Sequence, residues 1–150
     1  MKHGHKYSED DILELLKEKK LSVTGPRKLI LKLLTAEHGP YTADEIFQKL
    51  PKGSCDKASV YRSLSQFVDK DIVQIAHLEK DVVHYEFNHP DDHHHHIVCR
   101  LCHKVEVIHD CGIERLERTL EKNGYTNVKH RLEMVGTCDK CNQNKISRNG

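Results

Sequence analysis

The chain of 150 residues has no tryptophan, only three phenylalanines and two methionines, and a formal net charge of +1. It also lacks any run that approaches the roughly 20 apolar residues of a membrane-spanning helix. Its first eleven residues contain no apolar core, which excludes a secretory signal, so we expect a cytoplasmic protein with no membrane segment. Charged residues of both signs make up 31% of the chain, and its segments are clearly periodic, which argues against disorder.

Metal-ligating residues are abundant instead: the chain has 13 His and 6 Cys. In a reducing cytosol, clustered cysteines hold metal more often than they form disulfides. The length allows one or two small domains, and a domain of about 70 residues has a thin core. Bound metal would therefore help such a domain to fold.

The first half of the chain has the pattern of a winged helix. Ser8 and Thr24 are expected N-caps of two helices, and Thr42 with Glu45 predicts a capping box for a third. A fourth helix is predicted from about residue 56 to residue 69. Two short strands, residues 72–75 and 82–87, follow with a polar turn between them and predict a β-hairpin. The order predicts a winged helix-turn-helix in residues 1–87, with the fourth helix as the recognition helix.

Residues 88–92 are polar and include a proline, so they are the expected hinge. Beyond it, strands are predicted at residues 95–99, 104–108 and 127–135, with a helix at 112–122 that Gly124 ends. The polar tail, residues 142–150, is expected to fray. The fold class is therefore α+β, with a winged helix-turn-helix followed by a small α/β domain in residues 93–150.

Two CxxC pairs lie in this second domain: Cys99 with Cys102, and Cys138 with Cys141. Two such turns can complete a tetrahedral four-thiolate zinc site, which we expect to be structural. Redox or incidental thiols are the alternative. Cys55 and Cys111 belong to no such pair, and we expect neither to be a ligand.

Four consecutive histidines, His93 to His96, lead into the first strand of the second domain. Because side chains alternate along a strand, His93 and His95 face one way and His94 and His96 the other. One run can thus supply two metal sites, or it can be a solvated loop end. The candidates for further ligands are Glu114, His130, Glu86 and His38.

A basic stretch in the first domain is the candidate phosphate contact. Between Lys17 and Lys32, six basic residues accompany one acid, Glu18. This patch is either a DNA-facing surface or a solvated helix face.

The sequence resembles the ferric uptake regulator family from about Leu21 to Cys141. The segments that carry the resemblance are Val23–Arg27, Thr42–Phe47, Ala58–Leu64, His93–Cys102, His130–Glu133 and Gly136–Cys141. The resemblance implies a homodimer of an N-terminal winged helix and a C-terminal dimerisation domain. It also implies metal-activated binding to a palindromic operator in double-stranded DNA, as a repressor and not as an enzyme.

The resemblance also implies roles for particular residues. Tyr61 and Arg62 would enter the major groove, and further DNA contacts are expected from Lys57, Ser59 and Arg27. The two CxxC pairs match the structural zinc site of the family. The remaining sites are a regulatory one at Glu86, His94 and His96, with His38, and an additional one at His93, His95, Glu114 and His130.

The chain departs from the family pattern at two of these ligands. Family members often carry a histidine where this chain has Pro40, and His38 is the nearest substitute. The third position of the histidine run is often Asp in the family, and here it is His95.

The sensed ion is expected to be Fe(II), because Glu86 supplies a hard oxygen ligand and no cysteine lies near the hinge. A zinc sensor of the Zur type is the alternative, favoured by the all-imidazole run and by residues 124–130. A peroxide sensor of the PerR type is less favoured, because those proteins tend to have Asp where Glu86 stands. Mn(II) is an expected substitute in vitro.

Two other classes of protein fit parts of the sequence. His84 and Glu86 followed by a CxxC pair resemble a zinc deaminase signature, but Val98 stands where that signature has proline. A metal-storage protein would explain the His and Cys residues but not the winged helix. Metal-dependent operator binding would separate a regulator from both.

Overall fold

The computed structural model describes residues 6–37, 39–89 and 93–148. His38, a predicted ligand, and residues 90–92 of the predicted hinge lie outside these described ranges. The chain divides into two compact units, Met1–Pro90 (unit 1) and Asp91–Gly150 (unit 2). No helix of the described chain has both the length and the apolar character that crossing a membrane requires.

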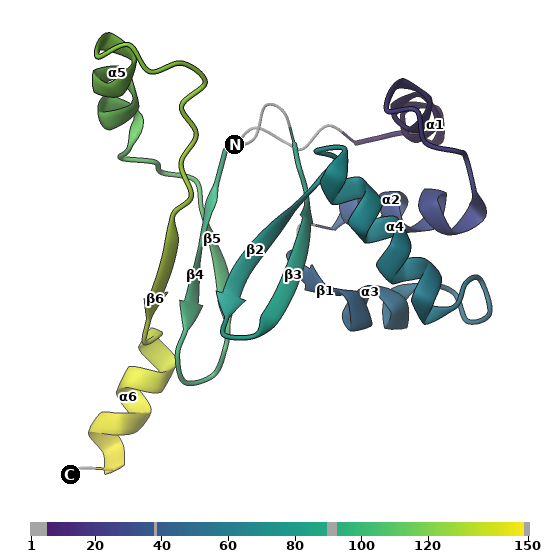
Figure 1. The fold of residues 1–150 in the computed structure, drawn as a ribbon. Helices are drawn as coiled ribbons and strands as arrows, with labels where there is room; N and C mark the ends of the chain where they lie inside the picture. The colour runs from purple at the N-terminus through teal and green to yellow at the C-terminus, as the bar shows by residue number, and fades with distance from the viewer. Residues whose placement is uncertain (1–5, 38, 90–92, 149–150) are drawn as a thin grey trace. The chain divides into compact units, whose positions relative to one another are not determined.

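Unit 1 begins with four helices (Figure 1). They are α1 (Glu9–Glu18), α2 (Gly25–Ala36), α3 (Ala43–Lys49) and α4 (Lys57–Asp69). The three predicted caps are present: the side chains of Ser8, Thr24 and Thr42 each accept a hydrogen bond from a backbone N–H in the first turn. Asp56, which was predicted only as the approximate start of the fourth helix, caps α4 in the same way. These caps set where each helix begins, because they satisfy N–H groups that have no partner within the helix.

A three-stranded antiparallel sheet completes unit 1, with the strand order β1-β3-β2. Its long strands are β2 (Val73–Glu79) and β3 (Val82–Phe87), and the short β1 (Tyr41–Thr42) pairs with Tyr85 and His84 of β3. The predicted hairpin is therefore correct, although β2 extends beyond residue 75 through an irregularity between Ala76 and Glu79. Strand β1 was not expected, because two residues are too few to show a period.

One apolar core joins the helices of unit 1 to its sheet. Leu16, Ile30, Ile46, Leu64 and Phe67 are each fully buried in it. They come from all four helices at helical spacing, as the amphipathic pattern requires. This core fixes α4, the predicted recognition helix, so its outer face can act as a rigid surface.

Unit 2 contains a second three-stranded sheet, with the strand order β5-β4-β6. Its elements are β4 (His95–Cys99), β5 (Val105–Ile108), α5 (Glu114–Lys122), β6 (Glu133–Gly136) and α6 (Asp139–Arg148). Strand β5 is antiparallel to β4, whereas β6 is parallel to it. Within this unit, α5 and α6 lie at opposite ends of the sheet (Figure 1).

Two expectations for unit 2 are wrong. The last strand begins at Glu133 instead of Asn127, because Asn127 adopts a left-handed backbone conformation (φ 54°) that ends any extended run there. The tail does not fray at residue 142 but forms α6 up to Arg148. The backbone N–H of Asn142 donates to the Cys138 carbonyl at 2.9 Å, so the second CxxC turn itself starts this helix.

The mixed α+β fold class predicted from the sequence is confirmed. Unit 2 has a thin interior. Among its described residues, the buried hydrophobic ones are Val98 and Cys99. So small an interior contributes little hydrophobic stabilisation, so unit 2 needs another source of stability.

Candidate metal centres and nucleic-acid interface

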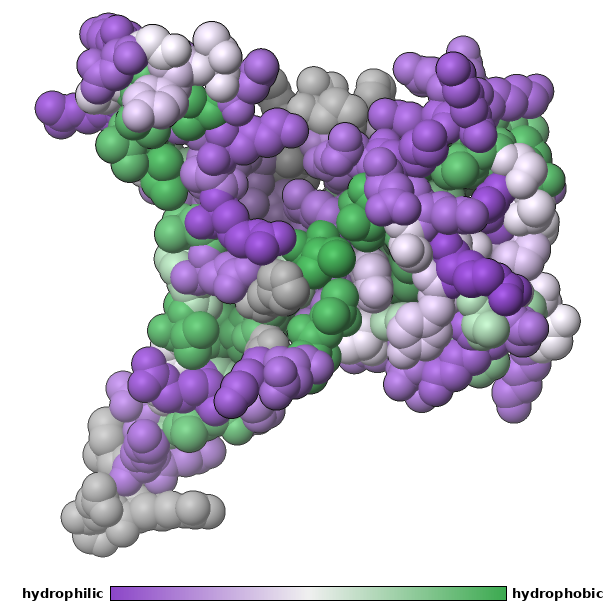
Figure 2. Space-filling model, in the orientation of Figure 1, coloured by the Kyte–Doolittle hydropathy of each residue, from purple (hydrophilic) through white to green (hydrophobic). Residues whose placement is uncertain are grey.

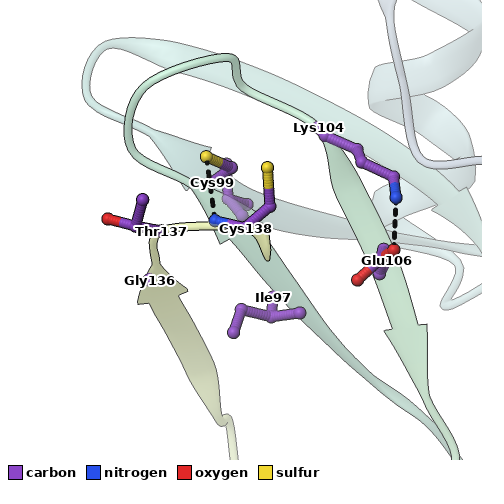
Figure 3. Close-up of a pocket in the computed structure, with 8 residues that line it drawn as sticks. Ile97, Cys99, Lys104, Glu106, Gly136, Thr137 and Cys138 are labelled. Carbon is purple, nitrogen blue, oxygen red and sulfur yellow. Dashed lines mark hydrogen bonds and ion pairs between the residues drawn. The ribbon is translucent and has the colours of Figure 1, made fainter. Parts of the chain in front are cut away.

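Both CxxC pairs come together at one end of the sheet in unit 2. The Sγ atoms of Cys99, Cys102, Cys138 and Cys141 all lie within 4.8 Å of one another. Cys99 ends β4 opposite Gly136 of the parallel strand β6, so the turns that follow these two strands meet. Figure 3 shows Cys99 and Cys138 side by side, with the Cys138 N–H donating to Cys99 Sγ at 3.3 Å.

Backbone donors prepare one of these thiols to bind a cation. The N–H groups of Cys102, Cys138 and Leu101 point at Cys99 Sγ and lower the pKa of Cys99 to about 5. Hydrogen bonds with Cys138 and, to a smaller extent, with Cys102 raise the pKa of Cys141 to about 12. Four thiols this close cannot all ionise without a cation, whereas four thiolates around one zinc ion form a closed tetrahedral site.

The second group of ligand atoms also belongs wholly to unit 2. It consists of His93, His95, Cys111 and His130, and their ligand atoms lie within 4.8 Å of one another. The Nε2 atoms of His93 and His95 are 3.1 Å apart, as the predicted alternation along the strand requires. His130 Nε2 lies 2.9 Å from that of His93 and 3.1 Å from that of His95.

The carboxylate beside this group differs from the predicted one. Glu114, the first residue of α5, is exposed and does not belong to the group. Glu117, one turn further along the helix, contacts His130 Nδ1 through its Oε1 atom. Cys111, which was not expected to be a ligand, lies with its Sγ atom 3.4 Å from His130 Nε2. No CxxC spacing marks this cysteine, and only the chain path between β5 and α5 brings it to His130.

His94 and His96 form a second histidine pair, as the alternation predicts. Their ring centroids are 5.1 Å apart, and the ring of His109 lies 6.0 Å from that of His94. Glu86 lies on β3 of unit 1, where it accepts a hydrogen bond from Gln74 Nε2 at 3.2 Å.

The predicted DNA-contacting residues cluster on α4 and beside it. Tyr61 is 47% exposed, and Arg62 is exposed with its guanidinium donating to Ser59 Oγ at 3.2 Å. Asp44 of α3 accepts from both Lys57 Nζ, at 2.9 Å, and Tyr61 Oη, at 3.4 Å. These contacts hold the start of α4 against α3 and orient its polar face.

Arg27, by contrast, already has protein partners. Its guanidinium donates to the Ser22 carbonyl at 2.6 Å and to Gln66 Oε1. It therefore links the start of α2 to the exposed side of α4.

Comparison with known proteins places this chain in one family. The model of the ferric uptake regulator family matches residues 18–135. A ferric uptake regulation protein from Neisseria meningitidis serogroup A is 38% identical over 130 residues, which cover 84% of this chain and 90% of that protein.

Solved structures give the same result. The ferric uptake regulator of Vibrio cholerae, described with rearranged DNA-binding domains, is 33% identical, with a TM-score of 0.70 over 83% of this chain and 98% of that one. The regulator of Francisella tularensis, solved with iron, is 32% identical, with a TM-score of 0.67 over 81% of this chain and 95% of that one. By sequence and by fold, the chain belongs to the ferric uptake regulator family, a family of transcriptional regulators.

Proposed function

We propose that this protein is a metal-responsive repressor of metal homeostasis that binds, as a homodimer, to a palindromic operator. Its relatives are named as ferric uptake regulators, and one is described as having DNA-binding domains. The observation that carries the proposal is the combination of two features in a member of this family. Metal-ligating side chains lie together in unit 2, and α4 of unit 1 has an exposed polar face. A regulator needs both features, whereas a zinc enzyme needs an open coordination position that four thiolates do not leave.

The structural metal in this proposal is Zn(II) held by Cys99, Cys102, Cys138 and Cys141. Support comes from the mutual approach of the four sulfur atoms and from the backbone donors that lower the pKa of Cys99. Zinc would cross-link the ends of β4 and β6 to the first turn of α6. That stabilisation compensates for the thin core of unit 2.

The regulatory metal in this proposal is held by His94 and His96 of unit 2 together with Glu86 of unit 1. His38, the fourth predicted ligand, lies outside the described residues. A metal that takes ligands from both units favours one arrangement of the winged helices, which is how an ion can control operator affinity.

The proposed signal is Fe(II). The carboxylate of Glu86 is a hard oxygen donor, and a relative of this chain was solved with iron. Zinc sensing is the second candidate, because the run from His93 to His96 offers imidazole alone. A peroxide-sensing role has less support, because peroxide sensors of the family tend to have Asp at the position of Glu86.

For DNA, the proposal places α4 in the major groove. Tyr61 would contact a thymine methyl group or a phosphate, and Arg62 a phosphate or a base edge. Lys57, Ser59 and Arg27 would add contacts around them. Both Tyr61 and Arg62 are exposed, which such contacts require.

The test is an operator-binding titration under anaerobic, metal-buffered conditions with Fe(II), Mn(II) and Zn(II) in turn. We expect DNA binding to depend on metal and to reach half-saturation at the buffered concentration typical of the sensed ion. The variant His96→Ala should keep its fold and lose metal-stimulated binding. Arg62→Ala should take up metal normally and bind DNA weakly at every metal concentration.

Each outcome of this titration is informative. Half-saturation at the free concentrations typical of zinc, together with no response at those typical of Fe(II), would replace the Fe(II) assignment with zinc sensing. Operator binding that is equally tight with and without metal in the parent protein would refute the metal-responsive function. Unchanged metal dependence in His96→Ala would remove His96 from the regulatory site.

A further inference from the structure

The group around His130 contains a sulfur ligand that its neighbours in sequence do not suggest. Three imidazole nitrogens and the Cys111 thiol surround one point within unit 2. The distances between these atoms can be compared directly with the edges of a coordination polyhedron.

Four of these distances are close to those of a tetrahedral zinc site. With Zn–N bonds of about 2.0 Å and a Zn–S bond of about 2.3 Å, tetrahedral ligands are about 3.3 Å apart for two nitrogens and about 3.5 Å for nitrogen and sulfur. The three Nε2 atoms are 2.9 to 3.1 Å apart, and Cys111 Sγ lies 3.4 Å from His130 Nε2. These four separations are thus close to those that one ion would impose, and all the ligand atoms of the group lie within 4.8 Å of one another.

Hydrogen bonding among the rings cannot account for this arrangement. Each Nε2 atom is either a donor or an acceptor, so among three mutually close nitrogens at least two have the same role. At least one of the three close contacts is therefore repulsive without a cation. A divalent ion removes the conflict because it takes a lone pair from every ring.

Glu117 fixes the orientation that coordination requires. Its carboxylate contacts His130 Nδ1, which holds the proton on that nitrogen and leaves the Nε2 lone pair directed at the group. A carboxylate behind a ligating histidine is the usual support of a zinc site. Glu117 is thus a positioning residue, and its place one turn after Glu114 keeps it out of the ligand group.

We propose that His93, His95, Cys111 and His130 form a zinc-selective site with three nitrogens and one sulfur, in which Cys111 replaces a carboxylate ligand. A thiolate favours Zn(II) over Fe(II) and Mn(II), which prefer oxygen donors and more ligands. The site lies within one unit and uses no residue of the proposed regulatory site. It therefore does not depend on operator binding, and either proposal can fail alone.

The test is thiol footprinting with iodoacetamide, read for each cysteine by peptide mass spectrometry. It uses the full-length protein carrying one tightly held zinc, before and after addition of buffered Zn(II). A metal-bound thiolate reacts slowly, so added zinc should slow the alkylation of Cys111 by about tenfold or more. Cys55, in unit 1, is the internal control and should react at an unchanged rate.

Variants identify the carboxylate and the nitrogens. Glu117→Gln should weaken zinc protection of Cys111 by about 10- to 100-fold in zinc concentration. Glu114→Gln is the matched control, and we expect protection as in the parent protein. His130→Ala should abolish protection, and continued protection of Cys102 in that variant shows that unit 2 is still folded. If Cys102 becomes reactive there, the Glu117→Gln result decides.

A cobalt experiment tests the sulfur ligand independently. Co(II) added to the zinc-containing protein should produce a thiolate-to-metal charge-transfer band while the zinc content, measured by elemental analysis, stays constant. Cys111→Ser should lose this band, and Cys55→Ser should keep it. An unchanged Cys111 alkylation rate at saturating zinc, a full band in Cys111→Ser, or loss of protection in Glu114→Gln but not in Glu117→Gln would each overturn the assignment.

Discussion

Arg27 and Arg62 are both proposed to contact DNA, but their surroundings differ. Arg62 is exposed and bonds to a side chain one turn away, Ser59. Arg27 joins α2 to α4 through Ser22 and Gln66. Arg62 is therefore available to contact DNA, whereas Arg27 also stabilises the packing of α2 against α4.

We expect this difference to separate two variants. Arg62→Ala should lower operator affinity by about 1–3 kcal/mol with little change in melting temperature. Arg27→Ala should lower both, since it also loses hydrogen bonds worth about 1 kcal/mol. Fluorescence anisotropy with labelled operator and thermal unfolding measure the two effects. Lys70→Ala, at the far end of α4, is the control, and an equal affinity loss there would indicate an effect of bulk charge.

Among the four proposed zinc ligands, Cys99 is the one whose thiol the surrounding backbone N–H groups stabilise most as a thiolate. Its lowered pKa gives a thiolate at neutral pH. Cys99 also ends β4 opposite Gly136 of β6, at the point where the two CxxC turns come together. Its removal should therefore prevent closure of the whole four-thiolate site and not merely weaken one bond.

Cys99→Ser is expected to lose one zinc per chain and to lose the dimer. Elemental analysis and analytical ultracentrifugation give both quantities on the same sample. Cys55→Ser, which changes a cysteine of unit 1, should keep full zinc and the parent mass. A Cys99→Ser dimer with full zinc content would contradict the structural role.

Among the elements, α3 holds the start of α4, the proposed recognition helix. Its first turn is fixed by reciprocal bonds: the Glu45 N–H donates to Thr42 Oγ1 at 3.1 Å, and the Thr42 N–H donates to Glu45 Oε2 at 2.8 Å. Asp44 in the same turn bonds to Lys57 and Tyr61 of α4. The capping box thus affects both the stability of α3 and the placement of Tyr61.

Thr42→Ala should lower the free energy of unfolding of unit 1 by about 1 kcal/mol, since it removes one side of the capping box. Denaturant unfolding followed by circular dichroism measures this change. Ser65→Ala, at an exposed position inside α4, is the matched control. Alanine is the better helix former there, so that variant should be unchanged or slightly more stable.

At the scale of the whole molecule, unit 2 carries apolar side chains that its own interior does not cover. Leu116 on α5 is 58% exposed, Tyr125 is 63% exposed and Val135 on β6 is 58% exposed. Figure 2 shows the hydrophobic side chains of α5 (green, upper left) next to hydrophilic ones. A second copy of the chain is the proposed cover, because burial of this surface would add the stability that the thin interior lacks.

Leu116→Glu should therefore shift the protein from dimer to monomer, because a buried carboxylate at the interface is costly. Analytical ultracentrifugation at micromolar concentration measures the mass. Val83→Glu, which alters an exposed aliphatic residue on the wing of unit 1, should leave the dimer intact. Dimers of equal stability in both variants would move the interface away from α5.

Local signals account for much of what the sequence predicted correctly. The caps at Ser8, Thr24 and Thr42 start their helices as expected, since they act on N–H groups of the same turn. The alternation of the histidine run also holds, because the pairing of His93 with His95 and of His94 with His96 follows from the strand period alone.

Errors occurred at two places in unit 2 where the apolar pattern does not reveal the backbone conformation. The late start of β6 follows from the left-handed backbone at Asn127 and from its short parallel ladder with β4. Helix α6 grows from the second CxxC turn, which composition alone presented as a polar tail.

The sequence by itself determined the mixed fold class, the family and the two CxxC pairs, because caps, periodicity and short spacings act within a few residues. Tertiary structure alone decided which carboxylate supports His130 and that Cys111 lies beside it. Cys111 and His130 are 19 positions apart, and only the paths of the chain through β5, α5 and β6 bring them to one point.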